Sequence, residues 1–161
     1  MQYVIFDLDN TLIDSSHRQC TLPNGTLDLV HWIENNKPEL IMKDSLLPAV
    51  KTIRADWKAG NIIILCTARV LSEADYTFLM ANDIPYHFML DRPMGCNALD
   101  ADLKEFHLRL FAHNQGINWA RFCETSVFYD DARSILIRGR KIGLNMIDAE
   151  LWNRDLRRMA R

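Results

Sequence analysis

Long apolar runs, a basic leader and paired cysteines are all missing from this sequence. No apolar run approaches the roughly 18 residues that mark a membrane-spanning helix. The N-terminus, Met1-Gln2-Tyr3-Val4, has no basic segment ahead of its apolar stretch, so we expect neither a membrane span nor a signal peptide. The cysteines form no C-x-x-C pair, which favours reduced, mostly structural thiols in a cytoplasmic protein. They are Cys20, Cys66, Cys96 and Cys123.

A strong charge imbalance and a glycine-rich phosphate loop are missing as well. Lys and Arg number 19 against 21 Asp and Glu, a net charge of −2 that excludes a global basic field for nucleic acid but leaves a local patch open. None of the six glycines begins a G-x-x-x-x-G-K-[ST] loop, which argues against a kinase domain. With 48% hydrophobic and 25% charged residues and no linker or repeat, the 161 residues predict a single domain, residues 1–161.

What the sequence does contain is an alternation of short apolar runs with helical patterns. The apolar runs cover residues 3–6, 62–65, 86–90, 126–129 and 142–147. Helical patterns follow Ser45 and Ser72 as candidate N-caps, continue in the stripe Leu99, Leu103, Phe106 and Leu110, and return at residues 131–138 and 151–159. Because strands alternate with helices over short joints, we predict an α/β fold with a doubly wound, three-layer parallel sheet.

Polar residues follow four of the predicted strands at the point where each strand ends. Asp7 and Asp9 follow the first strand, and Thr67-Ala68-Arg69 follows the second. Asp91-Arg92 and Asp130-Asp131 follow the third and fourth, and Lys104 lies in the helix before the fourth strand. Each residue alone is typical of a helix cap, a turn or a solvated helix face. Ligands of such sheets bind beyond the carboxyl ends of the strands, so together these residues predict one site.

The residue types at this edge predict a phosphate site with a metal ion. Two like charges about 4 Å apart repel by about 4 kcal/mol at an effective dielectric constant near 20. Clustering of Asp7, Asp9, Asp130 and Asp131 therefore calls for a divalent cation, and hard oxygen ligands without His or Cys suit Mg²⁺. Lys104, the Thr67 hydroxyl and nearby backbone N–H groups such as that of Ala68 would hold phosphate oxygens.

These residues resemble the four motifs of the haloacid dehalogenase (HAD) superfamily of phosphatases. Asp7-Leu8-Asp9-Asn10-Thr11 matches its D-x-D-x-T signature, and Thr67, Lys104 and Asp130-Asp131 match the other motifs in order. The resemblance implies that Asp7 is the nucleophile and that Asp9 donates a proton to the leaving alcohol and later activates water. It also implies a minimal cap or none, and Mg²⁺ held by the Asp7 carboxylate, the Asp9 backbone carbonyl and a carboxylate of Asp130 or Asp131.

A narrower similarity links the chain to the 3′-phosphatase domain of bacteriophage polynucleotide kinases. It is carried by residues 64–69, 89–93, 102–105 and 129–133. The similarity implies that Arg69 and Arg92 contact the substrate beyond its reacting phosphate. It predicts removal of a 3′-phosphate from nucleic-acid ends or nucleotides, in the host cytoplasm for a phage-encoded enzyme. A small-metabolite or 5′-nucleotide phosphatase of the same fold is the alternative.

Two non-enzymatic hypotheses need to be weighed, and the role of residues 15–43 has two interpretations. A signalling receiver domain uses similar residues, but there the acidic pair comes first along the chain. Here the D-x-D motif comes first, and the acidic pair Asp130-Asp131 follows only at the fourth strand. An inactive binding module has no support, because every motif position carries a chemically competent residue. Residues 15–43 fit either a small flap, with His17-Arg18 near the substrate, or a solvated connection with Trp32 packed on the helices.

Overall fold

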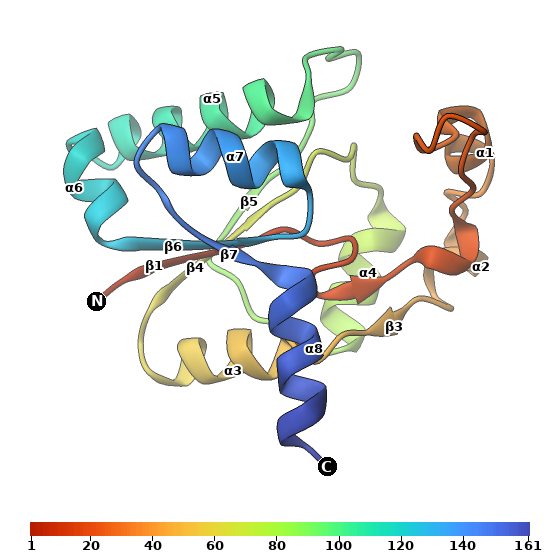
Figure 1. Cartoon of the computed structure of the whole chain (residues 1–161), viewed down its shortest axis with the longest axis horizontal. Coiled ribbons are helices and arrows are strands. Elements are labelled where there is room, and N and C mark those ends of the chain that lie inside the picture. Colours follow the sequence, from red (N-terminus) through yellow and green to blue (C-terminus); the bar gives the residue numbers. More distant parts are fainter.

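Five parallel strands form the central sheet of the computed structural model, which describes residues 1–161 (Figure 1). The strand order is β5-β4-β1-β6-β7, with β1 in the centre. Ile5 of β1 pairs with Ile64 of β4 on one side and with Phe128 of β6 on the other. The strands are β1 (Tyr3–Phe6), β4 (Ile62–Cys66), β5 (Phe88–Leu90), β6 (Ser126–Asp130) and β7 (Asn145–Asp148). The predicted parallel α/β sheet is therefore confirmed.

Helices cover both faces of this sheet, in the predicted three layers (Figure 1). Val4 and Phe6 of β1 pack with α3 (Val50–Lys58) and α4 (Glu73–Ala81) on one face. Ile5 packs on the other face with α5 (Asp100–Asn114), α6 (Trp119–Glu124) and α7 (Arg133–Lys141). Successive residues of a strand point to opposite faces, so a continuous apolar run supplies both cores.

Two expected helix starts have different outcomes. Ser72 caps α4 as predicted, in a capping box in which the Asp75 carboxylate accepts from the Ser72 backbone N–H at 2.8 Å. Ser45 is not an N-cap: it lies in β3 (Ser45–Leu46), and α3 begins only at Val50. Pro48 explains the difference, because the residue before a proline is driven out of the helical region.

The predicted apolar stripe of α5 has the right period but the wrong phase. Of its four residues only Leu103 is buried, whereas Leu99, Phe106 and Leu110 are exposed. The buried face instead carries Leu103, Lys104, Leu108, Phe111 and Ala112. This face packs Leu108, Phe111 and Ala112 on the sheet and turns Lys104 towards the carboxyl ends of β1 and β6.

Residues 15–43 form small elements of their own beside the main sheet (Figure 1). A 3₁₀ turn (Ser16–Arg18), α1 (Leu29–Glu34) and α2 (Pro38–Ile41) lie between β2 (Ile13–Asp14) and β3, which pair antiparallel.

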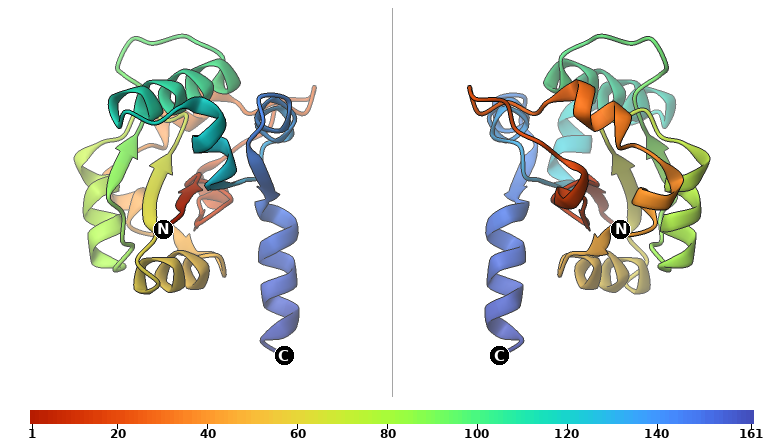
Figure 2. Two further views of the ribbon diagram at one scale, coloured as in Figure 1. Left: turned by 90° about the vertical axis from the view of Figure 1, so that its left-hand side faces the viewer. Right: turned by 90° about the vertical axis from the view of Figure 1, so that its right-hand side faces the viewer.

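The terminal helix α8 (Ala149–Met159) extends away from the sheet, as both views of Figure 2 show. Asn153 fixes its base, accepting from Ala49 N–H at 2.7 Å and donating to Thr11 C=O at 2.9 Å. None of the helices combines the length and hydropathy that crossing a membrane requires.

Candidate active site

Lys104 joins the two aspartates that follow β1 and end β6. Its ammonium nitrogen lies 2.7 Å from Asp7 Oδ1 and 2.6 Å from Asp130 Oδ2, and all three side chains are buried. Burial alone would lower the pKa of Lys104, but the two carboxylates outweigh it and raise that pKa above its usual value. Lys104 is therefore a fixed positive charge at the carboxyl end of the sheet.

Three of the four predicted carboxylates meet beside this lysine. Each of Asp7, Asp130 and Asp131 offers an oxygen within 4.8 Å of the other two, and we call these three residues the acidic cluster. Burial raises the pKa of Asp7 well above its usual value, and the neighbouring Asp130 adds to this rise. Burial and Asp130 also raise the pKa of Asp131, to about 6. The ionised cluster is thus unfavourable in the chain alone.

The donor set of the acidic cluster fits a small hard cation. It offers only carboxylate oxygens, the ligands that Mg²⁺ prefers, and no His or Cys. Lys104 neutralises only part of the cluster, so a divalent ion among the three carboxylates would relieve the remaining repulsion. A side-chain interaction with Asn10 counteracts part of the rise in the pKa of Asp131.

The Asp9 side chain lies outside the acidic cluster. Its Oδ2 is 2.7 Å from Arg69 Nε, and its Oδ1 accepts a hydrogen bond from Ser15 Oγ at 2.7 Å. The chain turns sharply after Asp9, where Asn10 adopts φ of 59°, a left-handed conformation that Asn tolerates better than most residues. The prediction that four carboxylates cluster is therefore wrong for the Asp9 side chain, and the cluster contains three. The position of Asp9 outside the cluster is compatible with the role of proton donor that the resemblance implies for it.

The β4 end presents the predicted phosphate-binding groups. Thr67 is buried, and its hydroxyl accepts the Arg69 backbone N–H at 3.2 Å. Its own N–H donates to Leu90 C=O of the neighbouring β5, which fixes the turn that follows the strand. The backbone N–H of Ala68 makes no hydrogen bond within the chain and is available to an anion.

Both predicted substrate-binding arginines are engaged by the protein itself. Arg69 pairs with Asp9 and, through Nη2, with Asp75 Oδ1 at 2.8 Å. Arg92 donates to the backbone carbonyls of Ala68, Cys96 and Ala98 and to Asp100, at 2.6, 2.9, 2.8 and 2.7 Å. It therefore holds the loop between β5 and α5 against the β4 turn. Direct contact of either arginine with substrate stays a prediction.

Several contacts at the site were not predicted from the sequence, which suggested only that Trp32 packs on the helices. Ser15 and Asp75 hold Asp9 and Arg69, while Trp32 and Asn36 reach Arg69 from the 15–43 segment. Only Asp75 carried a sequence signal, as the acidic member of an S-x-x-D capping pattern behind Ser72.

The His17-Arg18 pair binds Asp44, so the predicted proximity of this pair to substrate stays untested.

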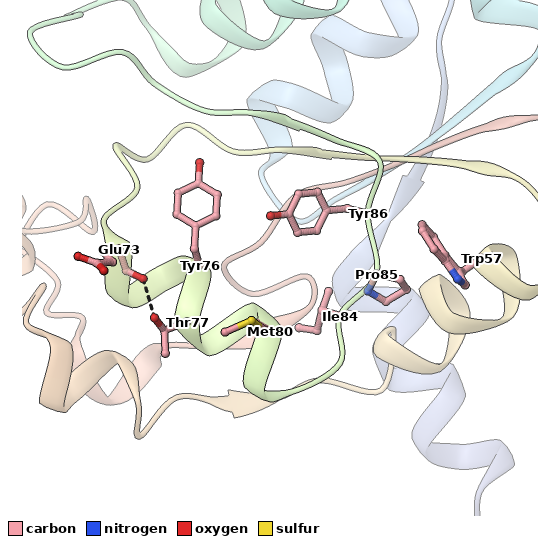
Figure 3. A pocket seen from close by; sticks show the side chains of 8 residues that line it. All are labelled: Trp57, Glu73, Tyr76, Thr77, Met80, Ile84, Pro85 and Tyr86. Carbon is pink, nitrogen blue, oxygen red and sulfur yellow. Dashed lines mark hydrogen bonds between the residues drawn. The ribbon is translucent and has the colours of Figure 1, made fainter.

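A cavity of about 460 Å³ lies elsewhere, between α4 and the segment that leads into β5 (Figure 3). Its lining is mostly apolar and includes Trp57, Tyr76, Met80, Ile84 and Tyr86. None of the predicted site residues lines it, so the acidic cluster is not part of this cavity.

Solved structures with the same fold include several hydrolases. A haloacid dehalogenase-like hydrolase from Streptococcus pneumoniae covers 95% of this chain and 90% of its own at 11% identity, with a TM-score of 0.65. A HAD-superfamily hydrolase of subfamily IA from Geobacter sulfurreducens covers 91% and 88% at 13% identity, with a TM-score of 0.62. A chain of the Pnkp1/Rnl/Hen1 RNA repair complex covers 91% and 42% at 22% identity, with a TM-score of 0.61. The fold is therefore that of the HAD-superfamily hydrolases, as predicted.

Within this class, the N-terminal half of the chain defines the family. Residues 1–89 match the model of the bacteriophage T5 5′-deoxynucleotidase family, and the chain belongs to this family. The 5′-deoxynucleotidase of Escherichia phage T5 is 44% identical over 80 residues, which are 47% of this chain and 33% of that protein. The chain thus matches about a third of the length of this curated relative.

Proposed function

We propose that the chain is a Mg²⁺-dependent phosphatase that removes the phosphate of a deoxynucleoside 5′-monophosphate. The observation that carries the proposal is the buried contact of Lys104 with Asp7 and Asp130, next to Asp131. This arrangement provides a nucleophile, a fixed positive charge and a cation site within a few ångströms at the carboxyl ends of the strands. Phosphoryl transfer needs such positioning and charge stabilisation.

In the first chemical step, a carboxylate oxygen of Asp7 attacks phosphorus and forms an aspartyl-phosphate. The bond from phosphorus to the nucleoside oxygen breaks, and Asp9 donates its proton to that oxygen as the alcohol leaves. Lys104, the Thr67 hydroxyl and the Ala68 N–H hold the oxygens of the transferring group. A Mg²⁺ ion bound by the acidic cluster would supply positive charge that balances the phosphate dianion.

In the second chemical step, water hydrolyses the aspartyl-phosphate. Asp9, now ionised, takes a proton from the water as its oxygen bonds to phosphorus, and the bond to Asp7 breaks. The reaction returns the Asp7 carboxylate and the protonated Asp9 and releases inorganic phosphate. Asp9 loses one proton in the first step and regains one in the second, so the reaction needs no further acid or base.

The choice of a 5′-deoxynucleotide over a 3′-phosphate follows the family. Membership of the bacteriophage T5 5′-deoxynucleotidase family and the 44% identity to the phage T5 protein favour a nucleotide 5′-phosphate. The RNA repair chain is only 22% identical, so its likeness speaks for the fold alone. The 3′-phosphate remains the competing prediction, and one substrate panel separates the two.

The test compares hydrolysis rates with and without Mg²⁺ across matched substrates. These are a deoxynucleoside 5′-monophosphate, its 3′-isomer, a 3′-phosphorylated oligonucleotide and a sugar phosphate. We expect the 5′-monophosphate to have the highest kcat/KM and EDTA to abolish turnover. A preference for either 3′-phosphate would overturn the substrate assignment, and full activity in EDTA would overturn the metal dependence. Asp7→Asn, checked for folding by circular dichroism, controls for contaminating phosphatases.

A further inference from the structure

Arg69 is held at three separate points of its guanidinium group. Nε lies 2.7 Å from Asp9, Nη2 lies 2.8 Å from Asp75, and Nη1 donates to Asn36 Oδ1 at 3.4 Å. Its guanidinium carbon also lies 5.6 Å from the centre of the Trp32 ring. The contacts with Asp9 and Asp75 are ion pairs, and Asn36 and Trp32 add to them from the 15–43 segment, so both residues of that segment restrict how the guanidinium group can rotate.

The two partners from the 15–43 segment are themselves fixed. Arg18 is fully buried and binds both oxygens of Asp44, at 2.8 and 2.6 Å. The same guanidinium donates to Asn36 Oδ1 at 3.2 Å and lies 4.7 Å from the Trp32 ring centre. Arginine pairs of this two-bond type are strong and geometrically specific. Trp32 and Asn36, both contacted by Arg18, therefore form a wall against which Arg69 packs.

Arg69 in turn limits the freedom of Asp9. One oxygen of the Asp9 carboxylate meets Arg69 and the other meets Ser15, so the group is held at both ends. Proton transfer to a leaving group depends on the position of the acid, and small displacements cost large factors in rate. The 15–43 segment is thereby connected to the group that serves the leaving alcohol.

We propose that Trp32 and Asn36 are positioning residues that act through Arg69 to hold Asp9 in place for proton transfer. The proposal rests on the function proposed above, because it needs Asp9 to protonate the leaving group. It predicts that damage to this wall is felt in proportion to how much the leaving group needs a proton. A purely structural role for the two residues predicts no such dependence.

The test uses two phosphate esters of similar size without a nucleoside. Benzyl phosphate releases a poor alkoxide that needs a proton, whereas p-nitrophenyl phosphate releases a stable phenolate that does not. The measured quantity is kcat/KM, which covers the steps up to alcohol release and omits the later attack of water. The variants are Trp32→Leu and Asn36→Ala, with Asp9→Asn as the reference for complete loss of proton donation.

We expect Trp32→Leu and Asn36→Ala to lower kcat/KM for benzyl phosphate by about tenfold or more, given that positioned acids contribute 10²–10⁴-fold. For p-nitrophenyl phosphate the loss should stay within about threefold, and Asp9→Asn should show the same pattern more strongly. Trp32→Phe keeps an aromatic face for the guanidinium and should restore most of the benzyl phosphate rate. Ile33→Ala, an exposed change on the same helix, should match wild type on both esters.

Equal losses on the two esters, or none on either, would overturn the proposal. A loss confined to the nucleotide, with both esters unaffected, would show that the wall contacts the nucleoside instead, and would also overturn it. If wild type cleaved neither ester nor nucleotide, the proposed function itself would fall first. Should Trp32→Leu not fold, Asn36→Ala and Trp32→Phe still give the two rates that decide.

Discussion

The acidic cluster and the 15–43 segment flank Asp9, yet they arise from the sequence in opposite ways. The cluster consists of residues that end a strand or directly follow one, so the parallel sheet itself brings them together. The segment reaches the site through Asn36, which lies 33 residues before its partner Arg69 and follows no strand. Under the two proposals made above, the sheet fixes where phosphoryl transfer takes place, and the segment determines how well Asp9 is held.

Within the acidic cluster, Asp7→Asn should have the largest effect on activity. An amide is a very poor nucleophile, so kcat should fall by about a thousandfold or more. The fold should persist, because the amide keeps the shape of the carboxylate. Steady-state hydrolysis and a thermal melt measure both quantities. Substantial residual turnover in the purified variant would assign the nucleophile to another residue.

Lys104→Ala should have the largest effect on stability. It leaves Asp7 and Asp130 buried without their positive partner, and breaking such pairs typically costs about 3–5 kcal/mol. Chemical denaturation in EDTA measures the loss. Added Mg²⁺ should recover part of it, because the cation neutralises the same carboxylates. An unchanged free energy of unfolding in EDTA would contradict the ion-pair geometry.

The pKa of Asp131 gives the cluster a pH signature. Burial and Asp130 raise this pKa from 3.8 to about 6 in the folded chain, so the ionised group is less favourable folded than unfolded. The metal-free protein should therefore lose stability as pH rises through the interval between these two values. If Mg²⁺ binds at the acidic cluster as proposed, it binds the ionised carboxylate, so the stabilisation by Mg²⁺ should grow over the same interval. Melting temperatures with Mg²⁺ and with EDTA, at about pH 5 and about pH 7.5, measure this growth. A Mg²⁺ effect that is equal at both pH values would contradict it.

The smallest expected effect concerns Arg92, which belongs neither to the acidic cluster nor to the 15–43 segment. Its three carbonyl partners and Asp100 predict that Arg92→Ala loosens the loop before α5 and destabilises the chain by about 1–2 kcal/mol. If Arg92 holds only this loop, KM for the nucleotide should change less than about threefold. A large rise in KM with unchanged stability would instead support direct contact with the substrate.

The sequence predicted the positions of site residues best where these residues lie at the end of a strand. Asp7, Thr67 and Asp130 each follow or end an apolar run, and parallel pairing then puts them at one edge without further information. It was less informative about helix rotation: Phe106 shares the apolar period of α5, but Lys104 and Leu108 face the sheet. Periodicity gives the width of an apolar face, whereas the neighbours that bind it decide which face turns inwards.

The contacts around Asp9 lay beyond what local patterns reveal. Ser15 binds Asp9 across a turn, and Trp32 meets two arginines from different parts of the chain. Nothing in the spacing of these residues marks them, because each contact forms only after the chain has folded. The same holds for Arg69: a basic residue after a strand suggests substrate binding, but Arg69 already pairs with the carboxylates of Asp9 and the buried Asp75.

In the proposed reaction, Asp7 accepts the phosphoryl group beside a cation held by the acidic cluster. The most direct measurement is a crystal structure of the protein grown with Mg²⁺ and beryllium fluoride, which mimics the aspartyl-phosphate. We expect beryllium fluoride on an Asp7 carboxylate oxygen, near Lys104, with Mg²⁺ between Asp7 and the Asp130-Asp131 pair. Density for the fluoride on another residue, or carboxylates that point apart with no ion between them, would contradict it.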